Sequence, residues 1–470
     1  MSTPNTHHGA KRINEMLSPD KCKRIFFCGV GGINMSSLAE LTLKMGYSVA
    51  GSDRQKSELC EGLEAMGAEI FYSHAAENVE GCDAFVYTVA ISPDNPEYVR
   101  AGELSIPRIS RADYLGYIMT KYENRVGICG THGKSSTTAM CAAIFEAARR
   151  EPTVMCGAKF GLAASPFISG AKKDFIFEAC EYMDSFLDFN PTVAVVLNVE
   201  LDHVDYFSDI EQMKGSFSKF VSICTEAGGA VYNADDKNTV DALADFLGRR
   251  LSFGIESDAD LVAADLCENR GRFSYDMVYK GEKIAHIELS AAGRHSVMNS
   301  LAAAGAALML GVDVGAIARG LAEFGGVSRR MEYKGSFNGA DFYDDYAHHT
   351  TEIEASLSAF RKMTEGRLIC LFQSHTYSRT YALLDGFAKA LGLADLVIVA
   401  PIFSAREINE SGVSQYDLAK RIGDKAVSCA ELDECFELIK KTASEGDTVV
   451  LMGAGDAPKI LKNIELVKKS

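Results

Sequence analysis

Three short apolar runs in this chain are each followed at once by a glycine-rich turn. The turns begin at Gly29, Gly130 and Gly453, and a stretch with helical character follows each of them. A strand, a tight turn and a helix in this order are typical of parallel α/β sheets, in which ligands bind beyond the carboxyl ends of the strands. The pattern therefore predicts an α/β fold built on mainly parallel sheets.

The chain has 470 residues, which is too long for one compact core. The pattern of apolar runs predicts three domains, each built on such a sheet: a Rossmann-like domain over 1–122, a central P-loop-type domain over 123–327 and a Rossmann-like domain over 328–470. Residues 1–20 are polar and are expected to form a loose leader.

The overall composition excludes several classes of protein. The apolar fraction of 47% and the charged fraction of 24% are those of a globular protein. A net charge of −16 disfavours binding to nucleic acid. The longest apolar stretch, Leu301 to Val312, is too short to span a bilayer. The thirteen cysteines form no CxxC pair and no secretory signal precedes them, so reduced thiols in the cytoplasm are expected. The longer segment from Leu289 to Gly311 is interpreted as a buried helix.

The segment from Gly130 to Ser136 carries the strongest local signal. It reads Gly-Thr-His-Gly-Lys-Ser-Ser, follows the apolar run Val126 to Cys129 and opens a helical stretch. Glycines let successive N–H groups turn toward a phosphate, and a helix N-terminus adds a favourable field. Lys134 would reach the β- and γ-phosphates of a nucleotide and Ser135 would ligate Mg²⁺. The alternative is a glycine turn that only ends a strand.

A second glycine-rich turn reads Gly29-Val-Gly-Gly32, with Asp53 about twenty residues further on. It occupies the position of a dinucleotide fingerprint, although Asn34 fills the third glycine slot. The turn predicts binding of a nucleotide or pyrophosphate, and a purely structural turn is the alternative.

Acidic side chains and a histidine follow two further apolar runs. Glu178, Glu181 and Asp184 come after one run, and His203 comes after the run that ends at Asn198. Parallel strands would bring these residues to the edge that carries the phosphate loop. Carboxylate oxygens and an imidazole there suit one or two Mg²⁺ ions that bridge ATP and a second substrate. The alternative is a solvated acidic loop.

The last block places polar residues at the ends of two strands that are predicted to be neighbours. The first strand ends in residues 344–349, Asp-Asp-Tyr-Ala-His-His, and the second in residues 373–379, Gln-Ser-His-Thr-Tyr-Ser-Arg. Arg329 and Arg330 follow a Gly-Gly hinge, where one of them could reach a triphosphate on domain closure. A solvated arginine pair and hydrogen-bonded structural histidines are the alternatives.

Taken together, these motifs are similar to those of the Mur ligase family of peptidoglycan synthesis, and the similarity covers residues 22 to 460. The shortened phosphate loop is typical of that family. The other resembling segments are Gly29–Gly32, Met35–Ser36, Gly51–Asp53, Ser92–Pro96, Asn198–Asp205, Gly293–Asn299, 344–349, 373–380 and Ser404–Glu407.

The resemblance implies a role for each matching residue. Catalytic roles fall on Lys134, Glu181, His203, Arg330 and His348, and the metal ligands are Ser135, Glu181 and His203. ATP contacts fall on Gly130, Thr131, His132, Gly133, Lys134, Ser135, Ser136, Asn299, Arg329 and Asp345. UDP-sugar contacts fall on Gly29, Gly31, Gly32, Met35, Ser36, Asp53 and Ser92. Residues for the amino acid and for closure are Tyr346, His349, His375, Arg379 and Arg406.

The chain departs from the family pattern at a few of these sites. Where the family reads Glu-Ala-Asp-Glu-Ser-Asp, residues 178–183 read Glu-Ala-Cys-Glu-Tyr-Met, so Cys180 replaces a carboxylate. Asn34 stands where a small residue is usual. Ser296 replaces an asparagine, which leaves Asn299 for the adenine. Thr376 replaces an arginine, which leaves Arg379 for an anion.

The resemblance implies ATP-dependent ligation of L-alanine to the carboxylate of UDP-N-acetylmuramate through an acyl phosphate, with Mg²⁺ as cofactor. His203, His348 or the phosphate would take the proton of the amine. A cytoplasmic monomer or weak homodimer is expected. Three alternatives remain: a ligase for another amino acid or a peptide, a nicotinamide-dependent oxidoreductase using Gly29 to Asp53, and a nucleotide-sensing paralogue without turnover.

Overall fold

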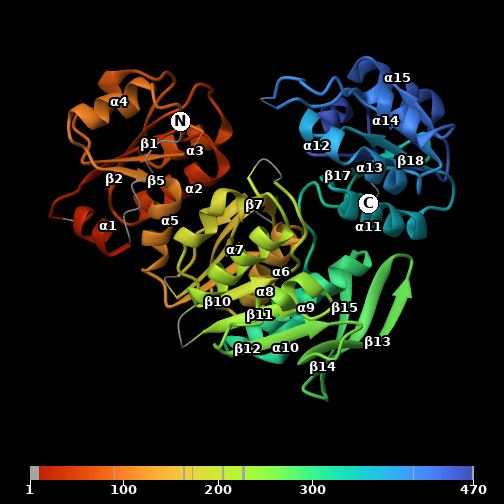
Figure 1. The fold of residues 1–470 in the computed structure, drawn as a ribbon, viewed down its shortest axis with the longest axis horizontal. Helices are drawn as coiled ribbons and strands as arrows, with labels where there is room; N and C mark the ends of the chain where they lie inside the picture. Colours follow the sequence, from red (N-terminus) through yellow and green to blue (C-terminus); the bar gives the residue numbers. More distant parts are fainter. Residues whose placement is uncertain are drawn as a thin grey trace. The chain divides into compact units, whose positions relative to one another are not determined.

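The computed structural model describes residues 10–18, 20–88, 90–161, 165–171, 173–203, 206–224, 228–405 and 407–467 (Figure 1). The chain forms two compact units, which are described separately. Unit 1 contains Met1–Lys159, Ser165–Val262 and Leu301–Gly320, and unit 2 contains Phe160–Ala164, Ala263–Ser300 and Leu321–Ser470.

Unit 1 begins with a parallel sheet of strand order β3-β2-β1-β4-β5. The central strand β1 is buried on both faces, as its run Ile-Phe-Phe-Cys requires. The chain order reverses between β1 and β4, which is where such sheets form a ligand crevice. The strands are β1 (Arg24–Cys28), β2 (Ser48–Ser52), β3 (Glu69–Phe71), β4 (Ala84–Tyr87) and β5 (Arg108–Ser110). The helices are α1 (Ala10–Met16), α2 (Ile33–Lys44), α3 (Glu58–Ala65), η1 (Ala76–Val79), α4 (Pro96–Glu103) and α5 (Arg111–Met119). The predicted loose leader is wrong for α1, because Ile13 and Leu17 are buried in the core of unit 1.

Unit 1 also contains seven strands of a ten-stranded sheet, in the order β12-β11-β10-β6-β9-β7-β8, and β13 of the same sheet belongs mostly to unit 2. Strand β6 lies between β10 and β9 and runs parallel to both, so the three strands end at the same edge. The strands are β6 (Asn124–Cys129), β7 (Thr153–Phe160), β8 (Ser165–Ile168), β9 (Asp174–Glu178), β10 (Val193–Val196), β11 (Gly229–Asn233), β12 (Arg250–Gly254) and β13 (Leu261–Asn269). The helices are α6 (Lys134–Ala147), η2 (Tyr182–Asp188), α7 (Ile210–Ser222), α8 (Lys237–Ala242) and α10 (Val314–Glu323).

The buried helix predicted from Leu289 to Gly311 is wrong in its first part. Strand β15 (Glu282–Ala292) pairs antiparallel with β14 (Arg272–Tyr279), and helix α9 (Arg294–Met309) begins only after Gly293. In β15 the buried Ile287 and Leu289 alternate with exposed residues, which is the period of a strand. The apolar character of the segment concealed this alternation.

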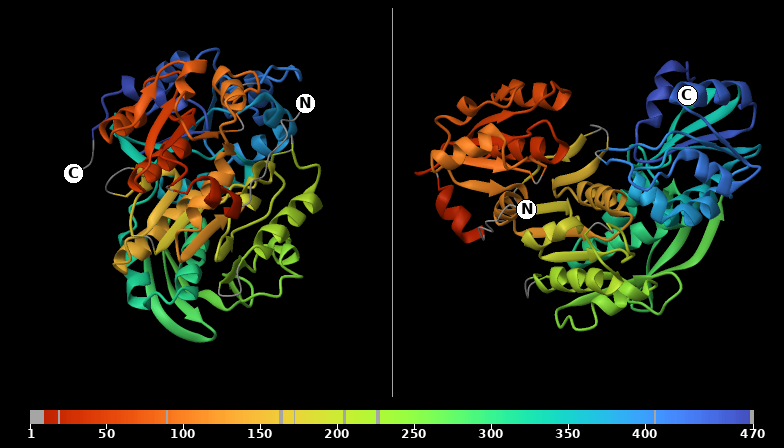
Figure 2. Two further views of the ribbon diagram at one scale, coloured as in Figure 1. Left: turned by 90° about the vertical axis from the view of Figure 1, so that its left-hand side faces the viewer. Right: turned by 45° about the horizontal axis from the view of Figure 1, so that its top comes forward.

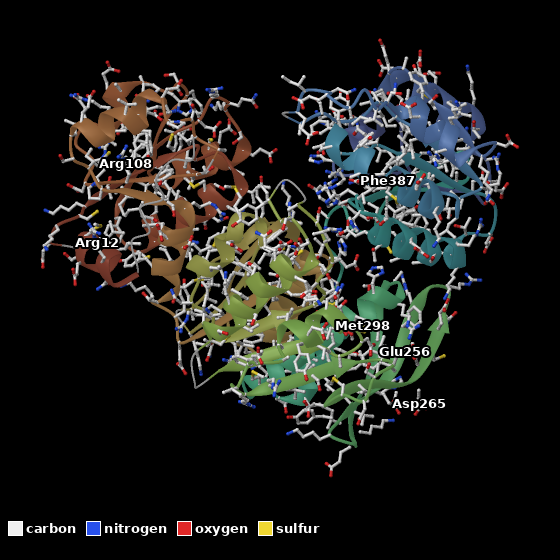
Figure 3. The ribbon with its side chains drawn as sticks, in the orientation of Figure 1. Arg12, Arg108, Glu256, Asp265, Met298 and Phe387 are labelled. Atoms are coloured by element: carbon white, nitrogen blue, oxygen red, sulfur yellow. The ribbon has the colours of Figure 1, made fainter. Side chains whose placement is uncertain are left out.

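Unit 2 contains a sheet of order β16-β17-β21-β18-β19-β20, in which only β16 is antiparallel to its neighbour among the described pairings. Phe387, which is labelled in Figure 3, belongs to its core. The Phe387 ring packs on Phe372, with 5.4 Å between ring centroids. The strands are β16 (Glu332–Phe337), β17 (Ala340–Asp345), β18 (Leu368–Phe372), β19 (Leu396–Val399), β20 (Ala426–Ser428) and β21 (Thr448–Met452). The helices are α11 (Thr350–Met363), α12 (Tyr377–Ala382), α13 (Leu384–Leu391), α14 (Gln415–Ile422), α15 (Leu432–Thr442) and η3 (Ala457–Asn463).

The prediction that β17 and β18 are neighbours is wrong. Strand β21 lies between them and pairs in parallel with both. A sequence carries no local signal for such a return, because Thr448 of β21 pairs with Asp341, 107 positions away in β17, and with Leu368, 80 positions away in β18.

The three sheets and their helices confirm the predicted fold class (Figure 2). The boundaries near residues 123 and 328 stay predictions. No helix in the described part of the chain is long and apolar enough to cross a membrane.

Candidate active site

The phosphate loop connects β6 to α6 at the carboxyl edge of the second sheet. Gly130 and Gly133 have φ values of +139° and +84°, which favour glycine. A Cβ on Gly130 would lie 2.9 Å from the Cβ of Leu197, so the loop also needs glycine for its approach to the chain after β10. Gly133 is the N-cap of α6 and offers no side chain to its first N–H groups. The loop therefore has the backbone and helix N-terminus that a phosphate requires.

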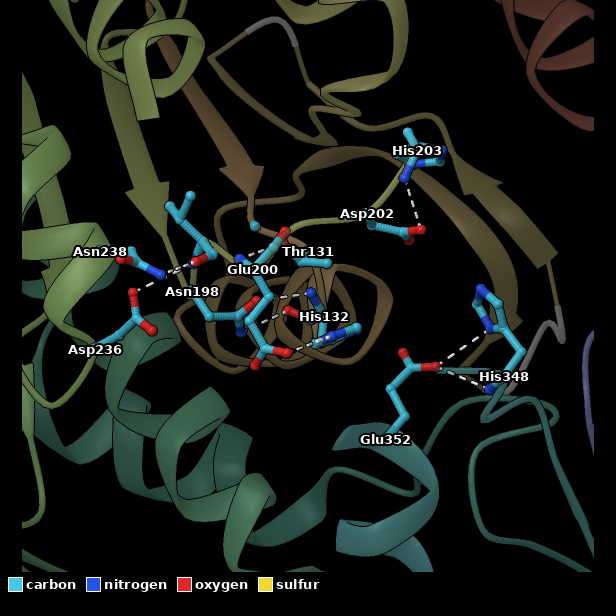
Figure 4. Close-up of polar contacts among 12 residues, drawn as sticks. Thr131, His132, Asn198, Glu200, Asp202, His203, Asp236, Asn238, His348 and Glu352 are labelled. Atoms are coloured by element: carbon cyan, nitrogen blue, oxygen red, sulfur yellow. Dashed lines mark hydrogen bonds and ion pairs between the residues drawn. The ribbon is translucent and has the colours of Figure 1, made fainter. Parts of the chain in front are cut away.

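Polar contacts fasten this loop to the segment that follows β10 (Figure 4). The His132 amide donates to Asn198 Oδ1 at 2.8 Å, and Asn198 Nδ2 donates to the His132 carbonyl at 3.2 Å. The Thr131 hydroxyl donates to the Glu200 carbonyl and accepts from the Glu200 amide, both at 2.9 Å. This role of Asn198 was not predicted from the sequence, although the residue ends a predicted strand.

Lys134, Glu181 and His203 come together in unit 1, as predicted. The Lys134 ammonium lies 3.2 Å from each carboxylate oxygen of Glu181, which is fully buried. His203 Nε2 lies 3.7 Å from Glu181 Oε1. Burial, the largest single effect, lowers the pKa of Lys134, but the charge and hydrogen bonds of Glu181, together with Cys180 and Glu178, raise that pKa by more. Lys134 is therefore charged at neutral pH and forms an ion pair with Glu181.

The predicted metal ligands fit a magnesium ion. Glu181 is a buried carboxylate at the end of the turn after β9, and Ser135 lies in the first turn of α6. Hard oxygen donors of this kind suit Mg²⁺, whereas the His203 imidazole is a less usual ligand for it. Glu178 is occupied elsewhere, because its Oε1 accepts from the Gly157 amide and the Cys156 thiol. This geometry favours Glu181 over Glu178 as the ligand.

The predicted UDP-sugar residues lie around the carboxyl end of β1. Gly29 adopts a φ of +79° directly after the strand. The Gly31 amide donates to Asp53 Oδ2 at 2.9 Å, and a Cβ on Gly31 would lie 2.8 Å from that oxygen. Gly32 is the N-cap of α2, and its first turns bury Met35 and Ser36. Ser92 donates to Asp94 nearby in sequence. Asn34 is exposed and does not fill a packing position.

A buried hydrogen-bond cluster beside this turn was missed by the sequence analysis. Glu97 is fully buried, and its Oε2 accepts from the Ser52 hydroxyl at 2.7 Å and the Cys28 thiol at 3.1 Å. His74 Nδ1 lies 2.8 Å from the same oxygen. Asn78 Nδ2 donates to Glu97 Oε1 at 2.8 Å. The cluster connects β1, β2, η1 and α4 behind the glycine turn. The one sequence feature that pointed to this cluster is Glu97 itself, an acidic residue directly after the Ser92–Pro96 motif.

Unit 2 gathers a second group of the predicted residues at the end of β17. The guanidinium groups of Arg329 and Arg330 lie 4.9 and 5.2 Å from the centre of the Tyr346 ring. Arg329 Nη2 donates to the Gly453 carbonyl at 2.8 Å, and Arg330 Nη1 donates to Glu352 Oε1 at 3.4 Å. Gly453 thus positions Arg329 through its backbone.

The predicted histidines of unit 2 form a chain of ring contacts. His348 lies 5.4 Å from the Tyr346 ring and 6.5 Å from His375, which stacks on Phe403 at 5.7 Å. His348 Nδ1 lies 3.2 Å from Glu352 Oε2 (Figure 4). Burial and the nearby Arg379 lower the pKa of His375.

The remaining predicted residues of unit 2 are placed as follows. His349 is buried and is the N-cap of α11. Asn299 is buried on α9. Thr376 has a φ of +68°, which is unusual for a residue other than glycine. Arg406 lies outside the described residues.

Two buried aspartates end strand β17. The Asp345 carboxylate accepts from the Ala347 amide at 2.9 Å and from Ser356, and burial raises its pKa. Asp344 lies 3.3 Å from Arg329 Nε. Burial raises the pKa of Asp344 to about 6, although Arg329 acts in the opposite direction. Asp344 therefore changes charge in a range where an exposed aspartate is already ionised.

This shift predicts a pH-dependent stability. Between pH 4 and 6 the folded chain holds a proton on Asp344 that the unfolded chain has lost, so this group makes stability fall as pH rises. Asp344→Asn removes that titration. The variant's free energy of unfolding, relative to that of the original chain, should rise by roughly 2 kcal/mol between pH 4 and pH 6. Denaturant unfolding at both ends of the range tests it, and an unchanged difference would contradict it.

The parallel α/β sheet carries a glycine-rich loop with a charged lysine, and a buried carboxylate lies next to that lysine. This arrangement is typical of proteins that bind a nucleotide and transfer its phosphoryl group. Comparison with known proteins narrows this class. The Mur ligase family catalytic domain matches residues 24–123, the Mur ligase middle domain matches 128–307 and the Mur ligase glutamate ligase domain matches 329–455. The chain belongs to the Mur ligase family.

Individual relatives cover almost the whole chain. UDP-N-acetylmuramate–L-alanine ligase of Acetivibrio thermocellus is 41% identical over 464 residues, which are 97% of this chain and 99% of that protein. The ligase of the same description from Caldanaerobacter subterraneus is 42% identical over 93% of this chain and 96% of its own length. The crystal structure of UDP-N-acetylmuramate-alanine ligase from Thermotoga maritima matches with a TM-score of 0.78 and 28% identity, covering 94% of this chain and 97% of that one.

Proposed function

We propose that this chain is an enzyme that uses ATP to join L-alanine to the carboxylate of UDP-N-acetylmuramate, in the synthesis of peptidoglycan precursors. The observation that carries the proposal is the Lys134–Glu181–His203 cluster beside the phosphate loop, in a chain whose near full-length relatives bear that description. Membership of the Mur ligase family argues against the oxidoreductase alternative. The phosphate loop argues against it as well, because hydride transfer does not need such a loop. Mg²⁺ is part of this proposal.

The first chemical step is phosphoryl transfer to the muramate carboxylate. A carboxylate oxygen attacks the γ-phosphorus of ATP, the bond to the β,γ-bridging oxygen breaks, and ADP leaves an acyl phosphate behind. Lys134, the first residue of α6, neutralises charge on the transferring phosphoryl group. The N–H groups at the start of α6 orient the phosphates. A magnesium ion held by Ser135 and Glu181 would supply further charge stabilisation there.

The second step forms the amide. The amine of L-alanine attacks the acyl carbon, the C–O bond to phosphate breaks, and inorganic phosphate leaves. The ammonium form must lose a proton first, and His203, His348 or the phosphate accepts it. The residues of unit 2 around Tyr346 would hold the amino acid, and Arg330 would add positive charge near the triphosphate.

The direct test is ADP release with ATP, Mg²⁺ and UDP-N-acetylmuramate, with L-alanine, glycine, L-serine or a tripeptide as separate acceptors. Release that requires both the UDP-sugar and L-alanine supports the proposal. A preference for the tripeptide would assign the chain to peptide ligation. Clear ATP binding without turnover on any acceptor would favour a nucleotide-sensing protein.

Cys180 offers a test of the magnesium part of the proposal. Its side chain is exposed and directly precedes Glu181 in the sequence. Cys180→Asp adds a negative charge near the ion, so the Mg²⁺ concentration for half-maximal ADP release should fall by about fivefold, the factor for ~1 kcal/mol. Cys180→Ser is the matched neutral control. Equal Mg²⁺ titrations for all three proteins would show that residue 180 lies outside the ion's field.

A further inference from the structure

The aromatic ring of Tyr182 lies against the imidazole of His203. The ring centroids are 4.7 Å apart and the planes are inclined by 40°. Tyr182 directly follows Glu181, whose carboxylate Oε1 is 3.7 Å from His203 Nε2. His203 is thus flanked by two consecutive residues, one of which offers charge and the other a flat apolar face.

The backbone after Glu181 is shaped to bring Tyr182 into this place. Met183 and Asp184 have φ values of +54° and +56°, so the chain turns sharply directly after the tyrosine. Asp184 then accepts from the Tyr206 hydroxyl at 2.8 Å and from Ser216 on α7. These hydrogen bonds stabilise a turn whose left-handed backbone conformation is uncommon for residues other than glycine.

Tyr182 is itself held on its second side. The Tyr206 ring packs edge-to-face on it with 6.4 Å between centroids, and Tyr206 in turn packs on the buried Phe207 at 4.9 Å. Tyr182 therefore lies between His203 and an aromatic pair anchored in the core. Edge-to-face and tilted rings at these separations attract one another.

The His203 side chain has few other restraints. Its backbone is held, because its amide donates to Asp202 Oδ1 at 2.7 Å with a φ of +52° (Figure 4). In the described part of the chain, the polar and aromatic partners of the imidazole are Glu181 and Tyr182.

We propose that Tyr182 is a positioning residue that holds the His203 imidazole against Glu181 beside the phosphate loop. The inference rests on the proposed function for its catalytic consequence, but not for its geometry. A misplaced side chain beside a transferring phosphoryl group costs rate even when every reacting group is present.

The geometry is tested by NMR of the histidine ring protons in the full chain. The His203 signals are assigned by their loss in His203→Gln. Ring currents from Tyr182 should displace them, and Tyr182→Leu should move them toward the positions of an exposed histidine. Tyr182→Phe should leave them nearly unchanged, and so should Tyr72→Leu, which removes a tyrosine at the surface of unit 1. Unchanged His203 signals in Tyr182→Leu would overturn the proposal.

Kinetics then test the consequence. Tyr182→Leu should lower kcat for ADP release by about tenfold or more with little change in the KM for ATP, and Tyr182→Phe should restore it. Binding of Mn²⁺ as a paramagnetic stand-in for Mg²⁺ gives a readout independent of turnover, and Tyr182→Leu should weaken it. Loss of ADP release in both Tyr182→Leu and Tyr182→Phe would contradict positioning by the ring. If the unaltered chain releases no ADP, the proposed function fails while the NMR result still decides the geometry.

Discussion

Lys134→Met is expected to lower ADP release by at least about a thousandfold, because it removes the one fixed positive charge that the phosphate loop places at the triphosphate. The ammonium group lies on the loop, donating to the Thr131 carbonyl at 3.1 Å and to both oxygens of Glu181. Methionine keeps the length of the side chain but neither the charge nor the donors. Steady-state ADP release with all substrates present measures the effect.

The matched control is Lys237→Met. Lys237 is also the first residue of a helix in unit 1, α8, but it is exposed. Its replacement should leave ADP release within about twofold, since a surface substitution removes no contact of the site. Comparable losses in the two variants would show that the effect of Lys134→Met is one of general folding.

Glu181→Gln is expected to lower ADP release by about a hundredfold or more and to raise the Mg²⁺ requirement. The amide keeps the size of the side chain but loses the negative charge that pairs with Lys134 and would ligate the ion. The same charge raises the pKa of Lys134, so the variant should also lower that pKa. Mg²⁺ titration of ADP release measures the first effect.

A double variant separates stability from catalysis at this pair. Lys134→Met alone leaves the buried Glu181 carboxylate without the lysine, its nearest cationic partner, which should destabilise the chain by about 3 kcal/mol. Adding Glu181→Gln removes that unpaired charge, so the double variant should recover much of the lost stability while staying inactive. Recovery of activity along with stability would mean that the pair is structural.

Those parts of the fold that depend on local pattern could be predicted from the sequence. Composition and spacing alone predicted the apolar runs of β6 and β10. They also predicted the glycine loop after β6. Because β10, β6 and β9 are parallel neighbours, the predicted meeting of Lys134, Glu181 and His203 followed correctly.

The features that depend on distant residues could not be predicted. The return of β21 between β17 and β18 is a choice of pairing partner, and it made the predicted adjacency of β17 and β18 wrong. The Tyr182–His203 contact lies next to two consecutive left-handed residues, Met183 and Asp184, a conformation that is uncommon for residues other than glycine. The catalytic and binding roles given to individual residues stay predictions until the variants are measured.

The position of β21 also bears on how the chain is made. Residues 448–452 form the strand between β17 and β18, so those two strands have no shared neighbour until this segment has been synthesised. Until then, β17 and β18 each keep an unpaired edge. A chain truncated before residue 448 would have a gap between β17 and β18 in this sheet. The Gly453 carbonyl that accepts from Arg329 follows β21 directly, so synthesis of β21 precedes assembly of the Arg329–Tyr346 group.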